Sequence, residues 1–309
     1  MAINYKERNF LGFQEYIHRT DKAGSETSET PPYAHPVDER ILRTLNAMPI
    51  KAVMNQTMDA LISLQFGLDI ANSVQIDRKA FPDLFEMLHH CANTLGIPSP
   101  DVIIKEIKQN DKELITYSAG TDEYTFISIA PELLELFSRE EALFLIGCEC
   151  GHIASGHMLY HTLAKLLTNV YLENLGLLKE TLQVTAGVFL SAWSRRSEVT
   201  ADRAGLLCCG DIEIAQTALL RLAVKLEKVD RIDIDEYLRR ARETLKLHKL
   251  GELRLLFENQ PSIPMRIEAL RLFADSELYY SLSGKEKPCQ KILLSQDELN
   301  RQVNEIVKP

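Results

Sequence analysis

Apolar residues recur at helical spacing along most of the chain. The pattern predicts helices over residues 38–54, 58–68 and 81–95. The third stretch has Pro82 near its start and Gly96 just beyond its end, which is the usual asymmetry of helix termini. We therefore expect the part of the chain between residues 37 and 96 to be built mainly from helices.

The hydrophobic period changes near the middle of the chain. Three short segments rich in β-branched or aromatic residues, 102–107, 113–117 and 124–129, are separated by turn-forming residues and predict a small antiparallel sheet of about three strands. From residue 131 onward the spacing is helical again, with breaks at Gly210-Asp211 and at residues 261–264. Helices, a small sheet and further helices predict an α+β fold that is mainly helical.

Composition divides the chain into three parts. Residues 20–36 are rich in Ser, Thr, Glu and Pro and contain almost no large aliphatic residues, so they are expected to be a mobile linker or an extended strap within a flexible segment over residues 1–36. A main domain is expected over residues 37–275. Residues 276–309 are expected to form a tail with one weak helix.

Charge and cysteine content limit the function classes. The 309 residues carry a formal net charge of −9, which argues against nucleic-acid binding and against a polybasic membrane surface. The most apolar stretch, residues 181–193, is too short for a membrane span, and the N-terminus has no export signal. Six cysteines in such a chain are expected to be reduced thiols. These features predict a cytoplasmic protein.

The segment 138–161 holds the most informative cluster of chemical groups. Ser138 and Glu141 have the spacing of a capping box, which predicts a helix start at about Arg139. Cys148 and His152 are four positions apart, so both side chains lie on one face of that helix, with Glu149 on an adjacent stripe. A zincin helix uses the same layout, H-E-x-x-H, with two metal ligands one turn apart and a glutamate as general base.

A second segment, SRRSEVTADRAG at residues 194–205, supplies two more carboxylates. Glu198 and Asp202 are also four apart, and Glu198 could complete a three-ligand site. Asp202 is expected to accept a hydrogen bond from the distal ring nitrogen of His152. His157 lies 140° around the helix from His152 and is expected to be a structural or supporting residue rather than a ligand.

The two segments together resemble family 48 of the metallopeptidases, the gluzincin family that includes HtpX and the CAAX prenyl proteases. The resemblance rests on ECGHIASGH at residues 149–157 followed by SRRSEVTADRAG, and GHMLYHT at 156–162 is similar to the soluble bacterial branch. A late element of the family, a His-Pro pair followed by Arg-Ile, is matched by Gln260-Pro261 with Arg266-Ile267.

The resemblance implies a zincin-like core and a metalloendopeptidase that binds one Zn²⁺ per chain. By this resemblance Cys148, His152 and Glu198 are the metal ligands, and Glu149, Asp202 and Arg266 are catalytic residues. For Arg266, a structural salt bridge is an equal alternative. The implied partner is a peptide or unfolded protein. The resemblance also implies that an extended peptide pairs with the edge strand of the sheet, for which residues 124–129 are the candidate. The leucine-rich run 159–190 belongs either to the core or to a dimer surface, so a homo-oligomer is one of the possible states of the protein.

Two positions depart from the family pattern. Cys148 stands where the family has its first zinc-binding histidine, and Gln260 stands where it has the late histidine. A thiolate binds zinc well but lowers the charge of the centre by one, so bound water is acidified less. We therefore expect attenuated peptidase activity. A silent pseudo-peptidase that binds peptides or a partner protein, and an enzyme regulated by oxidation of Cys148, are the alternatives.

Overall fold

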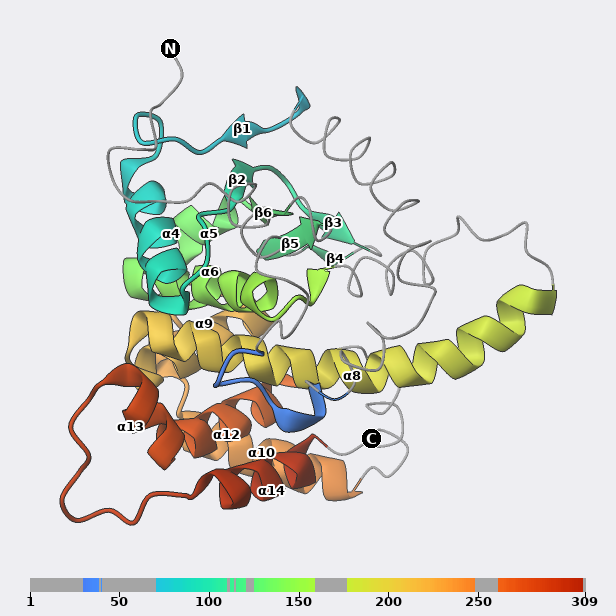
Figure 1. Cartoon of the computed structure of the whole chain (residues 1–309), viewed down its shortest axis with the longest axis vertical. Helices are drawn as coiled ribbons and strands as arrows, with labels where there is room; N and C mark the ends of the chain where they lie inside the picture. The colour runs from blue at the N-terminus through green and yellow to red at the C-terminus, as the bar shows by residue number, and fades with distance from the viewer. Residues whose placement is uncertain are drawn as a thin grey trace, which may run out of the picture.

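The sheet and two helices that run side by side form successive layers of the computed structural model (Figure 1). The helix α6 lies directly beneath the sheet, the long helix α8 runs alongside α6 on the side away from the sheet, and the C-terminal helices α12 and α14 lie on the far side of α8 (Figure 1). The helices are α4 (Pro82–Leu95), α5 (Glu132–Leu136), α6 (Arg139–Ala154), α8 (Leu177–Cys209), α9 (Ile212–Val224), the 3-10 helix η3 (Val229–Arg231), α10 (Ile234–Leu247), α12 (Ile263–Ala274), α13 (Glu277–Ser283) and α14 (Gln296–Ile306).

The structure describes only part of the chain. The predicted helices 38–54 and 58–68 lie mostly outside the described residues, whereas the predicted helix 81–95 is confirmed as α4. Its end is defined by Gly96, whose φ of 69° is left-handed backbone that glycine adopts without strain. The described residues are 30–38, 40, 71–109, 112–113, 115–120, 125–158, 177–247 and 261–307.

The sheet is mixed rather than antiparallel. Its strand order is β1-β2-β6-β5, in which β2 and β6 run parallel and the other neighbours run antiparallel. A separate two-stranded hairpin joins β3 to β4. The strands are β1 (Val74–Gln75), β2 (Asp101–Ile104), β3 (Lys108–Gln109), β4 (Lys112–Glu113), β5 (Thr116–Gly120) and β6 (Thr125–Ile129). The mainly helical α+β fold is therefore confirmed, with an additional strand and one parallel pairing.

The prediction that residues 124–129 form the edge strand is wrong. The strand β6 pairs with β2 on one side and with β5 on the other, and all five of its residues are buried. Such burial on both faces is typical of a central strand. Among the described strands, β5 lies at the end of the order, next to β6. The residues 118–120, expected to be a turn, belong to this strand.

Close contact between α6 and α8 is the main packing feature beneath the sheet. A methyl group added at Gly151 of α6 would lie 2.4 Å from the Cβ of Ala204 on α8. In the opposite direction, a methyl group added at Gly205 would lie 2.6 Å from the Sγ of Cys148. The small residues thus allow the two helix backbones to approach closely, which brings the chemical groups of α6 against those of α8.

The segment 30–38 lies along α8, where it is drawn in blue (Figure 1). Arg203 of α8 donates to the backbone oxygen of Tyr33, and the backbone nitrogen of His35 donates to Thr200 of α8. Tyr33, His35 and Asp38 are all buried. The composition of residues 20–36 predicted a mobile linker or an extended strap, and the described end of this segment is packed against the helix that carries Glu198.

The C-terminal residues are also packed. Helix α14 lies against α12, and Leu299, Val303 and Val307 are at most 1% exposed. Apolar residues at these helical intervals supply the stripe that α12 covers. The expected weak helix is therefore part of the hydrophobic core. Within the described residues, the helices are all too short or too polar to cross a lipid bilayer.

Candidate metal centre

The helix α6 carries three of the predicted site residues. It begins with the expected capping box, in which the hydroxyl of Ser138 accepts from the backbone nitrogen of Glu141 and the carboxylate of Glu141 accepts from the backbone nitrogen of Ser138. Cys148, Glu149 and His152 follow on the same helix and are all buried near the contact with α8 and the sheet.

His152 and Glu198 face each other across the α6–α8 contact. The Nε2 atom of His152 lies 3.7 Å from the Oε1 atom of Glu198. Two donors of one tetrahedral Zn²⁺, each about 2.1 Å from the ion, would lie about 3.4 Å apart. The pair is therefore spaced appropriately for two ligands of a shared zinc ion. The pKa of His152 is lowered well below its ordinary value, first by burial and then by His157 and Arg266, so the imidazole is neutral as a metal ligand must be.

The thiol of Cys148 points elsewhere. Its sulfur lies 3.8 Å from the Oδ1 atom of Asp202 and close to Gly205. Asp202 is one helical turn beyond Glu198 on α8, so the thiol is next to Asp202 rather than between His152 and Glu198. Burial and then the Asp202 carboxylate raise the pKa of this thiol well above its ordinary value. Among the described residues, no three His, Cys, Asp or Glu side chains converge as a metal site. Two of the three expected donors thus fit zinc, and the third is directed toward Asp202.

Arg266 joins the two carboxylates of α8. Its Nε and Nη2 atoms lie 2.9 and 2.6 Å from the two oxygens of Asp202, and its Nη1 atom lies 3.1 Å from Oε2 of Glu198. All three side chains are buried. Burial alone would lower the pKa of Arg266, but Asp202 and Glu198 raise it above its ordinary value. Of the two roles considered for Arg266, this geometry supports the salt bridge, which holds Glu198 toward His152.

The predicted hydrogen bond between His152 and Asp202 is replaced by another partner. The Nδ1 atom of His152 lies 2.9 Å from Nδ1 of His157, and Nε2 of His157 lies 2.8 Å from Oδ2 of Asp38. Asp202 is instead engaged by Arg266. Burial alone would raise the pKa of Asp38, but His157 and three hydrogen bonds lower it below its ordinary value. Sequence reasoning missed Asp38 because it lies 119 residues from His157.

Both carboxylate oxygens of Glu149 are bound to the sheet. The hydroxyl of Thr116 donates to Oε1 at 2.7 Å, and the hydroxyl of Ser118 donates to Oε2 at 2.5 Å. These residues are two apart on β5, so their side chains lie on the same face of the strand. The sequence analysis did not identify Thr116 and Ser118 as partners of Glu149. Hydroxyl residues two apart on a strand could have indicated this, but residues 118–120 were expected to form a turn. The late element at Gln260 lies outside the described residues.

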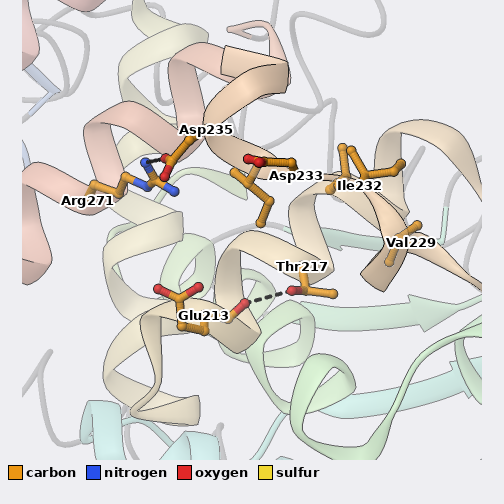
Figure 2. Close-up of a pocket in the computed structure, with 9 residues that line it drawn as sticks. Glu213, Thr217, Val229, Ile232, Asp233, Asp235 and Arg271 are labelled. Carbon is orange, nitrogen blue, oxygen red and sulfur yellow. Dashed lines mark hydrogen bonds and ion pairs between the residues drawn. The ribbon is translucent and has the colours of Figure 1, made fainter. Parts of the chain in front are cut away.

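A separate pocket lies between α9, η3, α10 and α12 and contains no histidine or cysteine (Figure 2). Its volume is about 330 Å³. The guanidinium of Arg271 lies 2.5 Å from the carboxylate of Asp235, and Glu213 and Asp233 lie nearby (Figure 2). It therefore lacks the imidazole and thiol groups that α6 supplies. The lining residues are Glu213, Thr217, Leu220, Val229, Ile232, Asp233, Ile234, Asp235 and Arg271.

Comparison with known proteins agrees with the two motifs on α6 and α8. The model of peptidase family M48 matches residues 78–274, which is well over half of the chain. The plastoglobule-localized metallopeptidase 48, chloroplastic, of Arabidopsis thaliana is 26% identical over 216 residues, which cover 68% of this chain and 61% of that protein. A protease HtpX homolog of Bordetella petrii is 26% identical over 215 residues, covering 61% of this chain and 69% of that protein.

No solved structure matches the chain. This chain spans less than two thirds of the plastoglobule relative, so the alignment leaves more than a third of that protein unmatched. The matched residues nevertheless include α6, α8 and most of the elements around them. The resemblance predicted from the sequence is confirmed at the level of the family: this chain is a member of peptidase family M48.

Proposed function

We propose that this chain is a zinc-dependent metalloendopeptidase in which Cys148, His152 and Glu198 hold one Zn²⁺ per chain. The observation that carries the proposal is the 3.7 Å separation between Nε2 of His152 and Oε1 of Glu198, on two helices of a metallopeptidase family member. When bound, zinc supplies Lewis acidity that polarises a peptide carbonyl and acidifies water. The substrate is a peptide or an unfolded protein.

Glu149 is the general base of the proposed reaction. It takes a proton from the attacking water and passes that proton to the leaving amine. Its two hydrogen bonds from Thr116 and Ser118 fix the carboxylate before substrate arrives, which reduces the loss of conformational freedom in the reaction. Because both donors lie on β5, a substrate strand that pairs with this end of the sheet would lie close to the base.

Arg266 and Asp202 position the ligand Glu198. The guanidinium lies within 3.1 Å of Glu198 Oε2, so the other oxygen remains directed at His152. Two carboxylates this deeply buried require a counter-charge, and Arg266 provides it. This arrangement supports a role in holding the site together rather than in binding substrate.

Cys148 is the weakest part of the proposed ligand set. Its thiol lies near Asp202, and metal binding requires loss of its proton, which burial and Asp202 oppose. A neutral zinc centre with one thiolate and one carboxylate polarises a carbonyl less than a centre with two histidines and one carboxylate. We therefore expect slow peptide hydrolysis. The position of the thiol also favours the second candidate function, a peptide-binding pseudo-peptidase that has lost the metal.

Metal loading of the full chain distinguishes the two candidates. Protein purified without added zinc is analysed for metal, and the metal-free protein is titrated with Co²⁺. The enzyme proposal predicts one metal per chain and a thiolate-to-cobalt absorption band that Cys148→Ser abolishes. Cys150→Ser is the matched control, because Cys150 is buried on the same helix but is 200° around from Cys148.

Peptide cleavage then tests the chemistry. An unstructured protein substrate should be cleaved by the zinc-loaded protein and left intact by Glu149→Gln, while both bind zinc equally. Cys148→His should raise the turnover number. If the chain binds no metal and Cys148→His cleaves nothing, the pseudo-peptidase is correct. The cytoplasmic location and the homo-oligomer remain predictions, which cell fractionation and sedimentation of the purified chain would test.

A further inference from the structure

A buried chain of hydrogen bonds connects the N-terminal segment to the proposed metal ligand His152. It runs from Asp38 through His157 to the Nδ1 atom of His152, with distances of 2.8 and 2.9 Å. Asp38 and His157 are fully buried, and His152 is 7% exposed. The rings of His157 and Trp193 also pack edge to face, with centroids 5.6 Å apart, which fixes the plane of the His157 ring.

The direction of each hydrogen bond follows from the groups that surround Asp38. Trp193 Nε1 and the hydroxyl of Thr200 both donate to this carboxylate at 2.8 Å. The indole nitrogen is a donor only, and an ionised carboxylate is an acceptor only. The contact from His157 Nε2 to Asp38 is therefore a donated hydrogen bond, which places a proton on Nε2 of His157.

The tautomer of His152 then follows from that of His157. A neutral His157 with its proton on Nε2 has a lone pair on Nδ1, so it accepts the Nδ1 proton of His152. The Nε2 atom of His152 is left unprotonated on the side that faces Glu198. A doubly protonated His157 would instead donate to His152 and leave a proton on Nε2 of His152. That proton would face the Glu198 carboxylate across 3.7 Å, so the protonation of Nε2 of His152 is the property that distinguishes the two arrangements.

We infer that Asp38 and His157 are positioning residues that hold His152 in the tautomer whose Nε2 lone pair is directed at the proposed metal. The inference rests on the proposed function only for the identity of the bound ion. It assigns a role to the N-terminal segment, because Asp38 reaches the site while Tyr33 and His35 bind that segment to α8. The tautomer of His152 that can bind a metal through Nε2 therefore depends on the packing of residues 30–38 against α8.

The substitution Asp38→Asn tests the direction in which the hydrogen bonds from His152 through His157 to Asp38 are donated. If the amide oxygen accepts from Trp193, the amide nitrogen faces His157 and donates to its Nε2 atom. This donation reverses both imidazole tautomers and puts the proton of His152 on Nε2. The same substitution of a buried aspartate acts through the wrong histidine tautomer in serine proteases. Thr200→Val is the comparison variant: it removes another hydrogen bond to the same carboxylate, and the acceptor of the His35 backbone nitrogen, without supplying a donor to His157.

Nitrogen-15 NMR of the imidazole groups in the metal-free full-length protein measures the tautomer directly. The unmodified chain and Thr200→Val should have an unprotonated Nε2 on His152, and Asp38→Asn should have a protonated one. Zn²⁺ affinity, measured by competition with a chromophoric chelator, should fall about 10- to 100-fold in Asp38→Asn and should fall less in Thr200→Val, which weakens the packing of residues 30–38 but leaves the tautomer unchanged.

Several outcomes would overturn the inference. A protonated Nε2 of His152 in the unmodified chain contradicts it without any variant, so failure of Asp38→Asn to fold does not prevent the test. If folded Asp38→Asn keeps the same His152 tautomer and the same Zn²⁺ affinity, the inference is wrong and Asp38 only contributes to packing. If the unmodified chain binds no Zn²⁺, the proposed function fails. The imidazole spectra still decide whether Asp38 and His157 determine the tautomer of His152.

Discussion

Arg266 binds both oxygens of Asp202, with Nε 2.9 Å from Oδ2 and Nη2 2.6 Å from Oδ1. Both side chains are buried in the contact between α12 and α8. A planar guanidinium matches a carboxylate in this two-point geometry, which lysine cannot reproduce. The pair therefore connects the last helix of the matched family region to the helix that carries Glu198.

Removal of Arg266 should destabilise the protein strongly. In Arg266→Gln, two buried carboxylates lose their counter-charge, and we expect the free energy of unfolding in urea to fall by about 3–5 kcal/mol. Arg301→Gln, which removes exposed ion pairs with Glu298 and Glu305, is the control and should leave the unfolding midpoint nearly unchanged. The double variant Arg266→Gln with Asp202→Asn should recover part of the loss. A small effect of Arg266→Gln alone would contradict the structural role.

Gly151→Ala should destabilise the α6–α8 contact. Inside a helix, Gly→Ala ordinarily stabilises by about 1 kcal/mol. Here the added methyl group would lie 2.4 Å from the Cβ of Ala204, so we expect a net loss of about 1–3 kcal/mol in urea unfolding. The second substitution Ala204→Gly should relieve the clash and make the pair less destabilised than Gly151→Ala alone. A stabilising Gly151→Ala would show that the helices do not approach this closely.

Acid should weaken the protein partly through His35. Burial first, and then Arg203 and Arg196, lower the pKa of His35 to about 3. The unfolded chain takes up this proton near pH 6.5, whereas the folded chain does so only near pH 3. The stability contributed by neutral His35 is therefore present above pH 6.5 and is lost as the pH falls toward 3, with a slope of up to about 1.4 kcal/mol per pH unit.

The variant His35→Asn isolates this contribution. Nδ1 of His35 accepts from the backbone nitrogen of Val37 at 3.2 Å, and an asparagine oxygen can accept from the same backbone group two residues on. The free energy of unfolding is measured by urea titration at several pH values. The unmodified chain should lose more stability than the variant between pH 6.5 and 4. Parallel profiles would exclude His35 as the titrating group.

The hydroxyls of β5 should matter for turnover more than for stability if Glu149 is the general base. Each hydrogen bond to an ionised carboxylate contributes about 1.5–3 kcal/mol, so Ser118→Ala should lower kcat about 10- to 100-fold if that energy holds the base in place. Ser128→Ala on β6 also removes a buried hydroxyl and is the control. Equal losses of kcat in both variants, or a change in KM alone, would contradict a specific role for Ser118 in positioning the base.

Helix positions followed from local signals in the sequence. The capping box at Ser138 and Glu141 predicted the start of α6, and the apolar spacing with Pro82 and Gly96 predicted α4, because both signals act within a few residues. The topology of the sheet could not be predicted in the same way. The parallel pairing of β2 with β6 joins segments about 25 residues apart, and no local pattern encodes which strands become neighbours.

The sequence by itself determined the family, through two ordered motifs, and determined which residues of α6 and α8 carry chemical groups, because four-residue spacing places side chains on one helix face. Only the tertiary structure decided how these groups pair. Close packing at Gly151 and Gly205 sets His152 opposite Glu198 and the Cys148 thiol opposite Asp202, and a segment more than 100 residues away supplies Asp38. Such pairings depend on the distance and rotation between helices, which helical periodicity within each segment does not specify.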